Sequence, residues 1–203
     1  MRRSLLGSIT VLALLAVPAA SAAAQETGTP IFKAPYRAFE QHEFGGSISD
    51  PGDFGDLGVE GFYRYGSKQN DFGVRAGILD GPGESGLLIG GEFRTQVISY
   101  SESFPLDGAL TLGLGGIFVD EAEDFFLLPI GISLGRRFDV ENSNTTFVPY
   151  VHPNIVPTFG AEDDVQFALG LGVDVRFSDR WVVRASGGLG DIEGVGVSLA
   201  YTR

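Results

Sequence analysis

Nine charged residues of this chain share one property: by alternation along the sequence, each lies on the face opposite large apolar neighbours. Four are acidic and five are basic, so they could line a polar channel or neutralise one another in pairs. Because buried charges are tolerated only when they are paired, we interpret them as interior ion pairs that fill and close a narrow space, with a charge-lined pore as the alternative. The nine residues are Glu43, Glu60, Arg64, Arg75, Glu92, Arg94, Asp174, Arg176 and Arg184.

The two histidines, His42 and His152, are the candidate general bases of the sequence. General-base or nucleophilic catalysis needs a base, a group that orients it and a nucleophile within mutual reach. His152 shares its side of the chain with Tyr150 and Asn154, but no acid or serine is placed beside it. Without such a constellation, we predict no catalytic residue, no enzymatic activity and no cofactor.

The densest acidic run consists of Asp120, Glu121, Glu123 and Asp124. Carboxylates are the ligands that Ca²⁺ and Mg²⁺ prefer, but these four lack the spacing of a known calcium-binding loop. The chain has no cysteine and only two histidines, so soft transition metals would also lack ligands. We therefore predict no specific metal site and keep the four acids as weak candidates for loose contact with divalent cations.

The charge balance excludes one class of partner. The chain of 203 residues has a formal net charge of −12. Nucleic-acid binding needs a basic surface that neutralises phosphates, so we predict no nucleic-acid partner. The absence of cysteine also excludes disulfide bonds and thiol chemistry.

The first residues have the pattern of an export signal. Two arginines precede an apolar run, and small residues follow it up to Ala24. The run is short for a membrane span of about 20 residues, and the small residues match a cleavage site. We expect residues 1–24 to be a cleaved secretory signal peptide, residues 25–38 an N-terminal lead-in, and residues 39–203 one folded domain.

The rest of the chain is predicted to form strands rather than helices. Glycine makes up 30 of the 203 residues, and each glycine inside a helix costs about 1 kcal/mol. Alternating apolar runs are separated by short turn-forming stretches such as SKQN and DGPGES, which leave no room for helices. Ten strands are expected, at residues 39–49, 57–66, 71–79, 86–98, 108–119, 125–138, 147–157, 165–177, 180–190 and 194–203.

One face of these strands consists of large apolar side chains and the other of small ones. In VQFALGLGVDVRF, alternate residues from Val165 to Phe177 are apolar, while Gly170, Gly172 and Asp174 lie opposite. A soluble barrel turns its apolar face inward, whereas a membrane barrel turns it toward lipid. Small residues with sparse charges suit the crowded interior of a narrow barrel. We therefore predict an all-β fold, a transmembrane antiparallel up-and-down β-barrel of ten strands.

Loops and aromatic residues support this topology. With an even number of strands and both termini on one side, the loops at the far end hold 14 of the 26 acidic residues. Aromatic residues on the apolar face fall into two groups, as in the girdles at the two interfaces of a membrane barrel. We assign Phe118, Phe126 and Phe167 to the outer interface. The residues assigned to the periplasmic interface are Tyr63, Tyr65, Phe72, Phe138, Phe177, Trp181 and Tyr201.

The chain resembles the small outer-membrane β-barrel proteins of Gram-negative bacteria, the porin-like or OmpA-type barrels, over residues 39–203. The last strand, GVGVSLAY, matches the assembly signal of that family, with Gly196, Leu199 and Tyr201 at its characteristic positions. The resemblance implies an outer-membrane monomer that contacts lipid and lipopolysaccharide and uses the barrel-assembly machinery during biogenesis. Because family members more often end on an aromatic residue, we expect deletion of Thr202 and Arg203 to be tolerated and Tyr201→Ala to impair insertion.

The fold alone does not fix a function. We predict a non-enzymatic outer-membrane protein, either a structural envelope protein or a narrow porin-like channel for small solutes. The first alternative is a secreted soluble β-barrel that buries its apolar face around an apolar ligand. The second is an outer-membrane barrel enzyme.

One predicted strand conflicts with the pattern. Residues 147–157 contain Pro149, Pro153 and Pro157, and Pro129 lies in the strand before them. Proline cannot donate to a sheet ladder, so either the pairing is broken here or the boundaries are wrong. An eight-stranded barrel with this hairpin packed elsewhere is the structural alternative.

Overall fold

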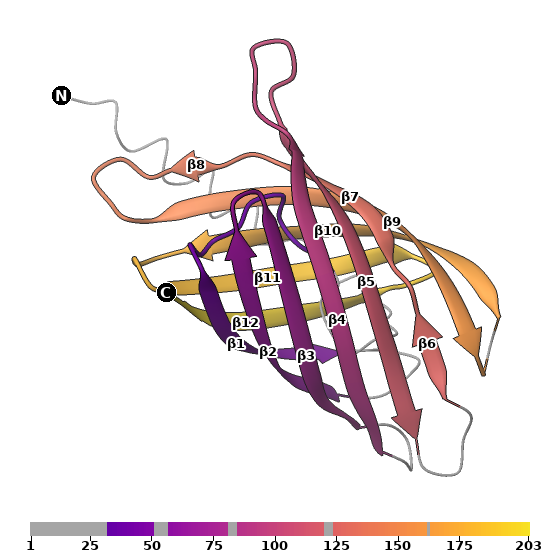
Figure 1. The fold of residues 1–203 in the computed structure, drawn as a ribbon. Coiled ribbons are helices and arrows are strands. Elements are labelled where there is room, and N and C mark those ends of the chain that lie inside the picture. Colours follow the sequence, from indigo (N-terminus) through magenta and orange to yellow (C-terminus); the bar gives the residue numbers. More distant parts are fainter. Residues whose placement is uncertain (1–31, 51–56, 81–84, 120–123, 162) are drawn as a thin grey trace, which may run out of the picture.

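Figure 1 shows a closed antiparallel barrel, a computed structural model that describes residues 32–50, 57–80, 85–119, 124–161 and 163–203. Three short strands, β6, β7 and β8, follow one another along one position, so the twelve strands fill ten positions. The strands are β1 His42–Asp50, β2 Leu57–Ser67, β3 Asn70–Asp80, β4 Ser85–Ile98, β5 Asp107–Val119, β6 Phe125–Leu127, β7 Ile130–Gly135, β8 Phe138–Asp139, β9 Thr146–Gly160, β10 Asp164–Arg176, β11 Trp181–Gly190 and β12 Gly194–Thr202.

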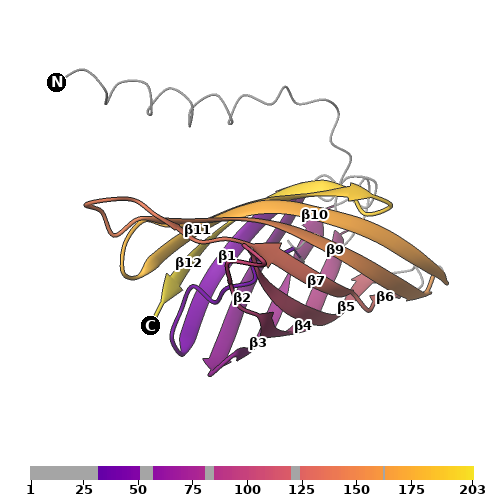
Figure 2. The ribbon, with the colours of Figure 1, turned by 90° about the horizontal axis from the view of Figure 1, so that it is seen from above.

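Neighbouring strand positions pair antiparallel, and the first and last strands close the barrel (Figure 2). β1 pairs with β12 from Glu43 opposite Thr202 to Asp50 opposite Val195. Closure gives every strand position a neighbour on both sides, which satisfies the backbone groups of a sheet edge. The predicted all-β, ten-stranded antiparallel barrel is confirmed, and the eight-stranded alternative is wrong.

The prolines of residues 147–157 lie inside β9, whose ladder with β10 is unbroken from Thr146 to Thr158. The Pro149 carbonyl accepts from the Arg136 N–H at 3.3 Å, so this edge of β9 faces β6 and β7. Successive residues of a strand point their side chains to opposite faces and their backbone N–H and C=O groups to opposite neighbouring strands. Residues that share a face therefore bond to the same neighbouring strand. The three prolines share one face and therefore direct their missing donors toward the same neighbour. That neighbour is the strand interrupted at Pro129, between β6 and β7.

The strands turn large apolar side chains outward and small or polar side chains inward. Leu114 in β5 and Val165 in β10 are 59% and 64% exposed, whereas Glu43 and Asp174 are 0% and 4% exposed. The apolar face of each strand therefore points outward, as the alternation along the sequence predicts. The outward apolar residues of the strands include Ile48, Val59, Val74, Ile78, Ile89, Leu112, Val197 and Leu199.

Aromatic side chains lie at both ends of this apolar surface. At the end that carries the C-terminus, Trp181 lies opposite Tyr201, and at the other end Phe126 lies opposite Phe159. Phe147 and Phe159 are twelve positions apart in β9. At about 3.4 Å per residue and a tilt of about 40°, they are separated by about 30 Å along the barrel axis, the thickness of a bilayer's hydrocarbon core.

Two layers of side chains fill the interior. Toward the end away from the C-terminus lies an apolar layer, and toward the C-terminal end lies a layer of ion pairs. The apolar layer consists of Leu79, Leu88, Ile117, Phe125, Leu127, Val156 and Ile192, each at most 5% exposed. In the part of the chain that the structure describes, no helix is long and apolar enough to cross a membrane.

Candidate functional site

The segment that precedes β1 lies inside the barrel, and we call residues 32–41 the inner segment. Phe32 and Ala34 are 2% and 0% exposed. The Lys33 backbone N–H donates to Nδ1 of His152 at 3.2 Å, and the Lys33 carbonyl accepts from the Ser133 hydroxyl at 2.5 Å. These contacts fix the inner segment to β7 and β9.

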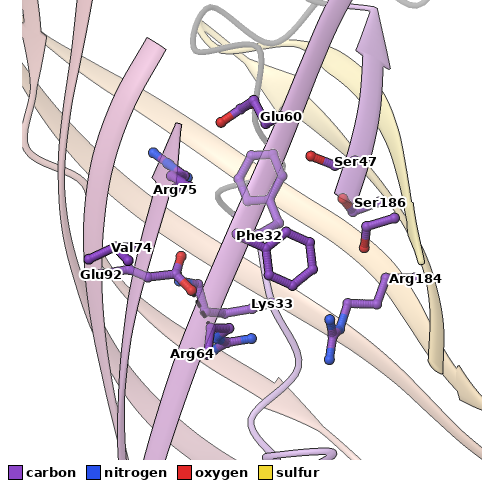
Figure 3. A pocket seen from close by; sticks show the side chains of 12 residues that line it. Phe32, Lys33, Ser47, Glu60, Arg64, Val74, Arg75, Glu92, Arg184 and Ser186 are labelled. Atoms are coloured by element: carbon purple, nitrogen blue, oxygen red, sulfur yellow. Dashed lines mark hydrogen bonds and ion pairs between the residues drawn. The ribbon is translucent and has the colours of Figure 1, made fainter. Parts of the chain in front are cut away.

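The Phe32 ring packs against β10 and β11, next to β9 in the barrel wall. A Cβ atom added at Gly170 in β10 would collide with the Phe32 ring, and one at Gly188 in β11 would lie 2.9 Å from it. The two glycines therefore form a seat for the ring. Figure 3 shows Phe32 in the lumen between Lys33 and Glu60.

Three ion pairs of the lumen join residues that stand directly opposite each other in neighbouring strands. Opposite charges in such positions stabilise a sheet because their Cβ atoms are close. All six side chains are at most 10% exposed, so water screens these pairs weakly. The pairs are Asp174–Arg184 at 2.9 Å, Asp71–Arg94 at 2.8 Å and Glu43–Arg64 at 3.5 Å.

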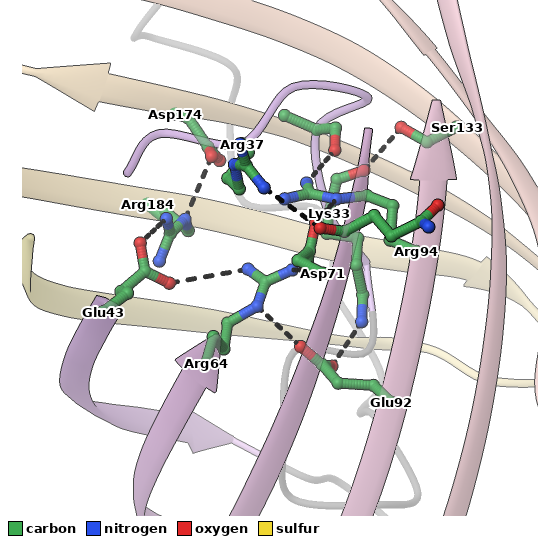
Figure 4. Close-up of polar contacts among 12 residues, drawn as sticks. Lys33, Arg37, Glu43, Arg64, Asp71, Glu92, Arg94, Ser133, Asp174 and Arg184 are labelled. Carbon is green, nitrogen blue, oxygen red and sulfur yellow. Dashed lines mark hydrogen bonds and ion pairs between the residues drawn. The ribbon is translucent and has the colours of Figure 1, made fainter. Parts of the chain in front are cut away.

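Two arginines connect the three pairs into one network (Figure 4). Arg184 also donates from Nη2 to Glu43 at 2.6 Å, which links β11 to β1. Arg64 donates from Nη2 to Asp71 at 2.6 Å, which links β2 to β3. The network therefore crosses the lumen from β10 to β4, and we call it the ion-pair layer.

The inner segment completes this layer. Arg64 Nε lies 3.0 Å from a carboxylate oxygen of Glu92, and the Lys33 ammonium pairs with the other Glu92 oxygen. A Cβ at Gly73 would lie 2.7 Å from Glu92 and 3.0 Å from Arg64, so a larger residue there would displace these side chains. Arg94 reaches the inner segment too, because its Nη1 donates to the Ala34 carbonyl. The layer thus ties the inner segment to the wall by charge.

Six of the nine charged residues singled out from the sequence lie in the ion-pair layer: Glu43, Arg64, Glu92, Arg94, Asp174 and Arg184. Arg176 does not, because it donates to the carbonyls of Ser178 and Asp179 at 3.2 and 2.7 Å and holds the turn before β11. Glu60 and Arg75 line a cavity instead, and both Glu60 carboxylate oxygens lack a hydrogen-bond partner among the described residues.

Sequence reasoning missed Asp71, Lys33 and the inner segment as a whole. Asp71 had a signal, since its parity relative to Phe72 and Val74 places it on the inward face of β3. Lys33 had none, because the inner segment lacks the alternation that marks a strand. The expected lead-in, residues 25–38, is described only from Phe32 onward, and the expected signal peptide lies outside the described residues.

Both histidines have hydrogen-bond partners. His152 is 0% exposed; since its Nδ1 accepts from the Lys33 N–H, its Nε2 carries the proton and donates to the Thr111 hydroxyl at 2.7 Å. His42 Nδ1 lies 2.9 Å from the Tyr63 hydroxyl and its ring stacks beside aromatic neighbours. These contacts give His152 a role in holding the inner segment.

The cavities between the inner segment and the wall are small. One of about 50 Å³ lies beside Phe32, Glu60 and Ser186, and others of about 10 and 20 Å³ lie nearby. Such spaces hold a few water molecules at most. A cavity of about 370 Å³ opens instead at the C-terminal end of the lumen, and we call it the vestibule. It is lined by Pro35, Tyr36, Arg37, Phe39, Glu40, Lys68, Gln69, Asp71, Arg94, Gln96 and Arg137.

The other residues singled out from the sequence take these places. Of the acidic run, Asp120, Glu121 and Glu123 lie outside the described residues, and Asp124 is exposed. The described residues contain no cluster of three or more potential metal ligands. In the last strand Gly196 faces the lumen, whereas Leu199 is 47% exposed and Tyr201 is half-buried against Trp181. The interface aromatics Tyr65, Phe72, Phe138, Phe177 and Trp181 are 41–55% exposed, and Tyr63 is half-buried.

No family model and no curated protein sequence matches this chain. Three solved structures are similar at 12% identity: a bacterial polysaccharide outer membrane secretin (TM-score 0.48), the beta domain of the Bordetella autotransporter Brka (0.46) and a structure from the de novo design of transmembrane beta-barrels (0.36). They cover 71%, 81% and 84% of this chain and 56%, 100% and 97% of their own chains, so this chain spans about half the length of the secretin. At these scores the similarities are too distant to carry a conclusion.

Proposed function

We propose that this protein is an integral outer-membrane barrel with a sealed lumen, which acts as a structural component of the envelope. The observation that supports membrane embedding is the inverted distribution of side chains. Leucine, valine and phenylalanine cover the outside, while Glu43, Asp174 and Arg184 are buried at 0–9% exposure. Water would penalise such an outer surface in proportion to its apolar area, whereas lipid favours it.

The same distribution argues against a secreted soluble barrel that binds an apolar ligand. That function requires an apolar cavity inside and a polar surface outside. Here the cavity beside the inner segment is small, and the ion-pair layer occupies one half of the lumen.

Three features support a sealed lumen over a channel. The ion-pair layer crosses the barrel, the apolar layer fills the other half, and the inner segment is bound between them. An ion that entered would have to displace paired charges and then cross packed apolar side chains, both of which are costly. A non-enzymatic structural role in the outer membrane follows as the function that this geometry supports best.

The test is conductance of the purified full-length protein in planar lipid bilayers. We expect insertion without conductance steps over a wide voltage range. The double variant Phe32→Gly/Lys33→Gly, which frees the inner segment from its seat and from Glu92, is expected to give current fluctuations. Heat-modifiable gel mobility shows that each barrel is folded. Stable open steps in the unmodified protein would overturn the sealed lumen, and release from cells by osmotic shock would overturn the membrane location.

A further inference from the structure

The basic residues of the described chain fall into two groups. Five lie in the lumen: Lys33, Arg64, Arg75, Arg94 and Arg184. The other seven, Arg37, Lys68, Arg136, Arg137, Arg176, Arg180 and Arg203, lie at the end that carries the C-terminus. The loops of the opposite end carry none of these bases. The vestibule opens at this basic end.

The vestibule concentrates this charge. Arg37, Lys68, Arg94 and Arg137 line it, against only Glu40 and Asp71, so its lining carries two excess positive charges. The Asp71 carboxylate is already bound by Arg64 and Arg94. Positive charge in a concave, partly desolvated space attracts anions more strongly than the same charge on a flat surface.

Three of these cations are available to a ligand. Among the described residues, Arg37, Lys68 and Arg137 form no ion pair within 4 Å. The Arg37 guanidinium donates to the Asn70 carbonyl at 3.0 Å, and the Arg137 guanidinium lies 4.9 Å from the centre of the Tyr36 ring. Both side chains are therefore held at the vestibule while N–H groups remain free to donate.

Arg94 adds a buried donor to the wall of the vestibule. It is 2% exposed and fixed through Nε to Asp71 and through Nη1 to Ala34. Its Nη2 has no hydrogen-bond partner among the described residues. An unsatisfied buried guanidinium N–H is costly, and an anion in the vestibule would offset that cost by electrostatic attraction.

The turn that presents Lys68 supports a role for this residue. Lys68 has a φ of 54°, in the left-handed region that two-residue hairpin turns fill with asparagine, aspartate or glycine. Lysine in this conformation is strained, and such strain is found at functional positions.

The Tyr36 phenol, which also lines the vestibule, stays neutral, because burial and its hydrogen bond to Asp107 raise its pKa to about 12.

From this geometry we propose that the vestibule binds a phosphate-type oxyanion from the solvent at the C-terminal end of the barrel. Arginine suits this chemistry, because its planar fork donates two parallel hydrogen bonds to one oxyanion. Arg37, Lys68 and Arg137 contact the anion, and Arg94 provides fixed positive charge behind them. The site goes beyond the sealing role, since those three contact residues take no part in the ion-pair layer.

The test measures binding of inorganic phosphate to the full-length protein in detergent, by calorimetry at fixed ionic strength. The double variant Lys68→Gln/Arg137→Gln is expected to weaken binding by about tenfold or more. The matched control is Arg180→Gln/Arg203→Gln, which removes two exposed charges from the same end but outside the vestibule. The control is expected to bind phosphate like the unmodified protein.

A second arm identifies the source of the oxyanion. The same three proteins are titrated with a short-chain phosphatidylglycerol in place of phosphate. Saturable binding of either probe that only the vestibule variant loses supports the site, and the probe that binds more tightly identifies free phosphate or a lipid headgroup as the source. Equal loss in both double variants, or no saturable binding of either probe, would overturn the proposal.

Discussion

Glu43 illustrates how single residues hold this interior together. It is 0% exposed and joins Arg184 at 2.6 Å to Arg64 at 3.5 Å, so it connects the β10–β11 half of the ion-pair layer to the β2–β4 half. A buried pair adds little net stability over an apolar replacement. Removal of one partner is different, because the charges that remain are buried without compensation.

We therefore expect Glu43→Gln to lower the free energy of unfolding by about 3 kcal/mol. The amide keeps the shape of the side chain but leaves a net positive charge between Arg64 and Arg184. Denaturant titration of the protein in vesicles measures the change. Glu141→Gln, at an exposed position in the turn before β9, is the control and should change stability by no more than about 0.5 kcal/mol. Equal midpoints for the two variants would show that Glu43 does not stabilise the layer.

At the scale of elements, β9 shows how a barrel strand accommodates proline. All three of its prolines face outward, so their missing donors point toward the interrupted β6–β7 strand and leave the β9–β10 ladder intact. The same logic explains why that strand divides into short pieces.

This explanation predicts opposite outcomes for two substitutions in β9. Pro153→Val restores an N–H toward β7 and is expected to change stability by less than about 1 kcal/mol. Val148→Pro places the missing donor toward β10, opposite Asp174, and is expected to cost several kcal/mol, because the bilayer supplies no replacement partner. Denaturant titration in vesicles compares the two. Similar costs would contradict the assignment of the β9 edges.

The C-terminal strand also gains a role that its sequence does not show. The Arg203 backbone exchanges two hydrogen bonds with His42, each at 2.8 Å, and Thr202 is 4% exposed opposite Glu43. The structure therefore argues against the expectation that these two residues are dispensable.

We expect deletion of Thr202 and Arg203 to destabilise the barrel by about 2 kcal/mol or more, since it removes hydrogen bonds that close β1 onto β12. Arg203→Ala keeps those backbone groups and is the matched control, with stability unchanged. The temperature at which gel mobility shifts gives the readout for both. If the deletion behaves like Arg203→Ala, the closing bonds beyond Tyr201 are unimportant.

At the scale of the whole molecule, the apolar outer surface and its aromatic borders define a band about as thick as a bilayer. The lumen inside that band is closed by charge at one end and by apolar packing at the other.

This arrangement predicts that the cost of introducing a charge on the outer surface depends on its depth in the membrane. Leu114→Arg, at the centre of β5, is expected to cost about 2–4 kcal/mol in vesicles, whereas Val140→Arg, beyond β8, should cost about 1 kcal/mol or less. Both residues are exposed, so the difference arises only if lipid surrounds the centre of the barrel. Unfolding titrations from vesicles compare the two variants. Equal small costs would mean that water, not lipid, covers this surface.

The sequence by itself determined the ten strand positions, the outward face of each strand and most of the charges that face inward from the strands, because all three follow from an alternation of two residues. It also showed where proline would disturb pairing, although not which neighbour would be interrupted. Only the tertiary structure decided that residues 32–41 fill the lumen, that Lys33 pairs with Glu92, and that Arg176 holds a turn instead. Those outcomes depend on contacts between residues far apart in the chain, such as Lys33 with His152, and no local period encodes them.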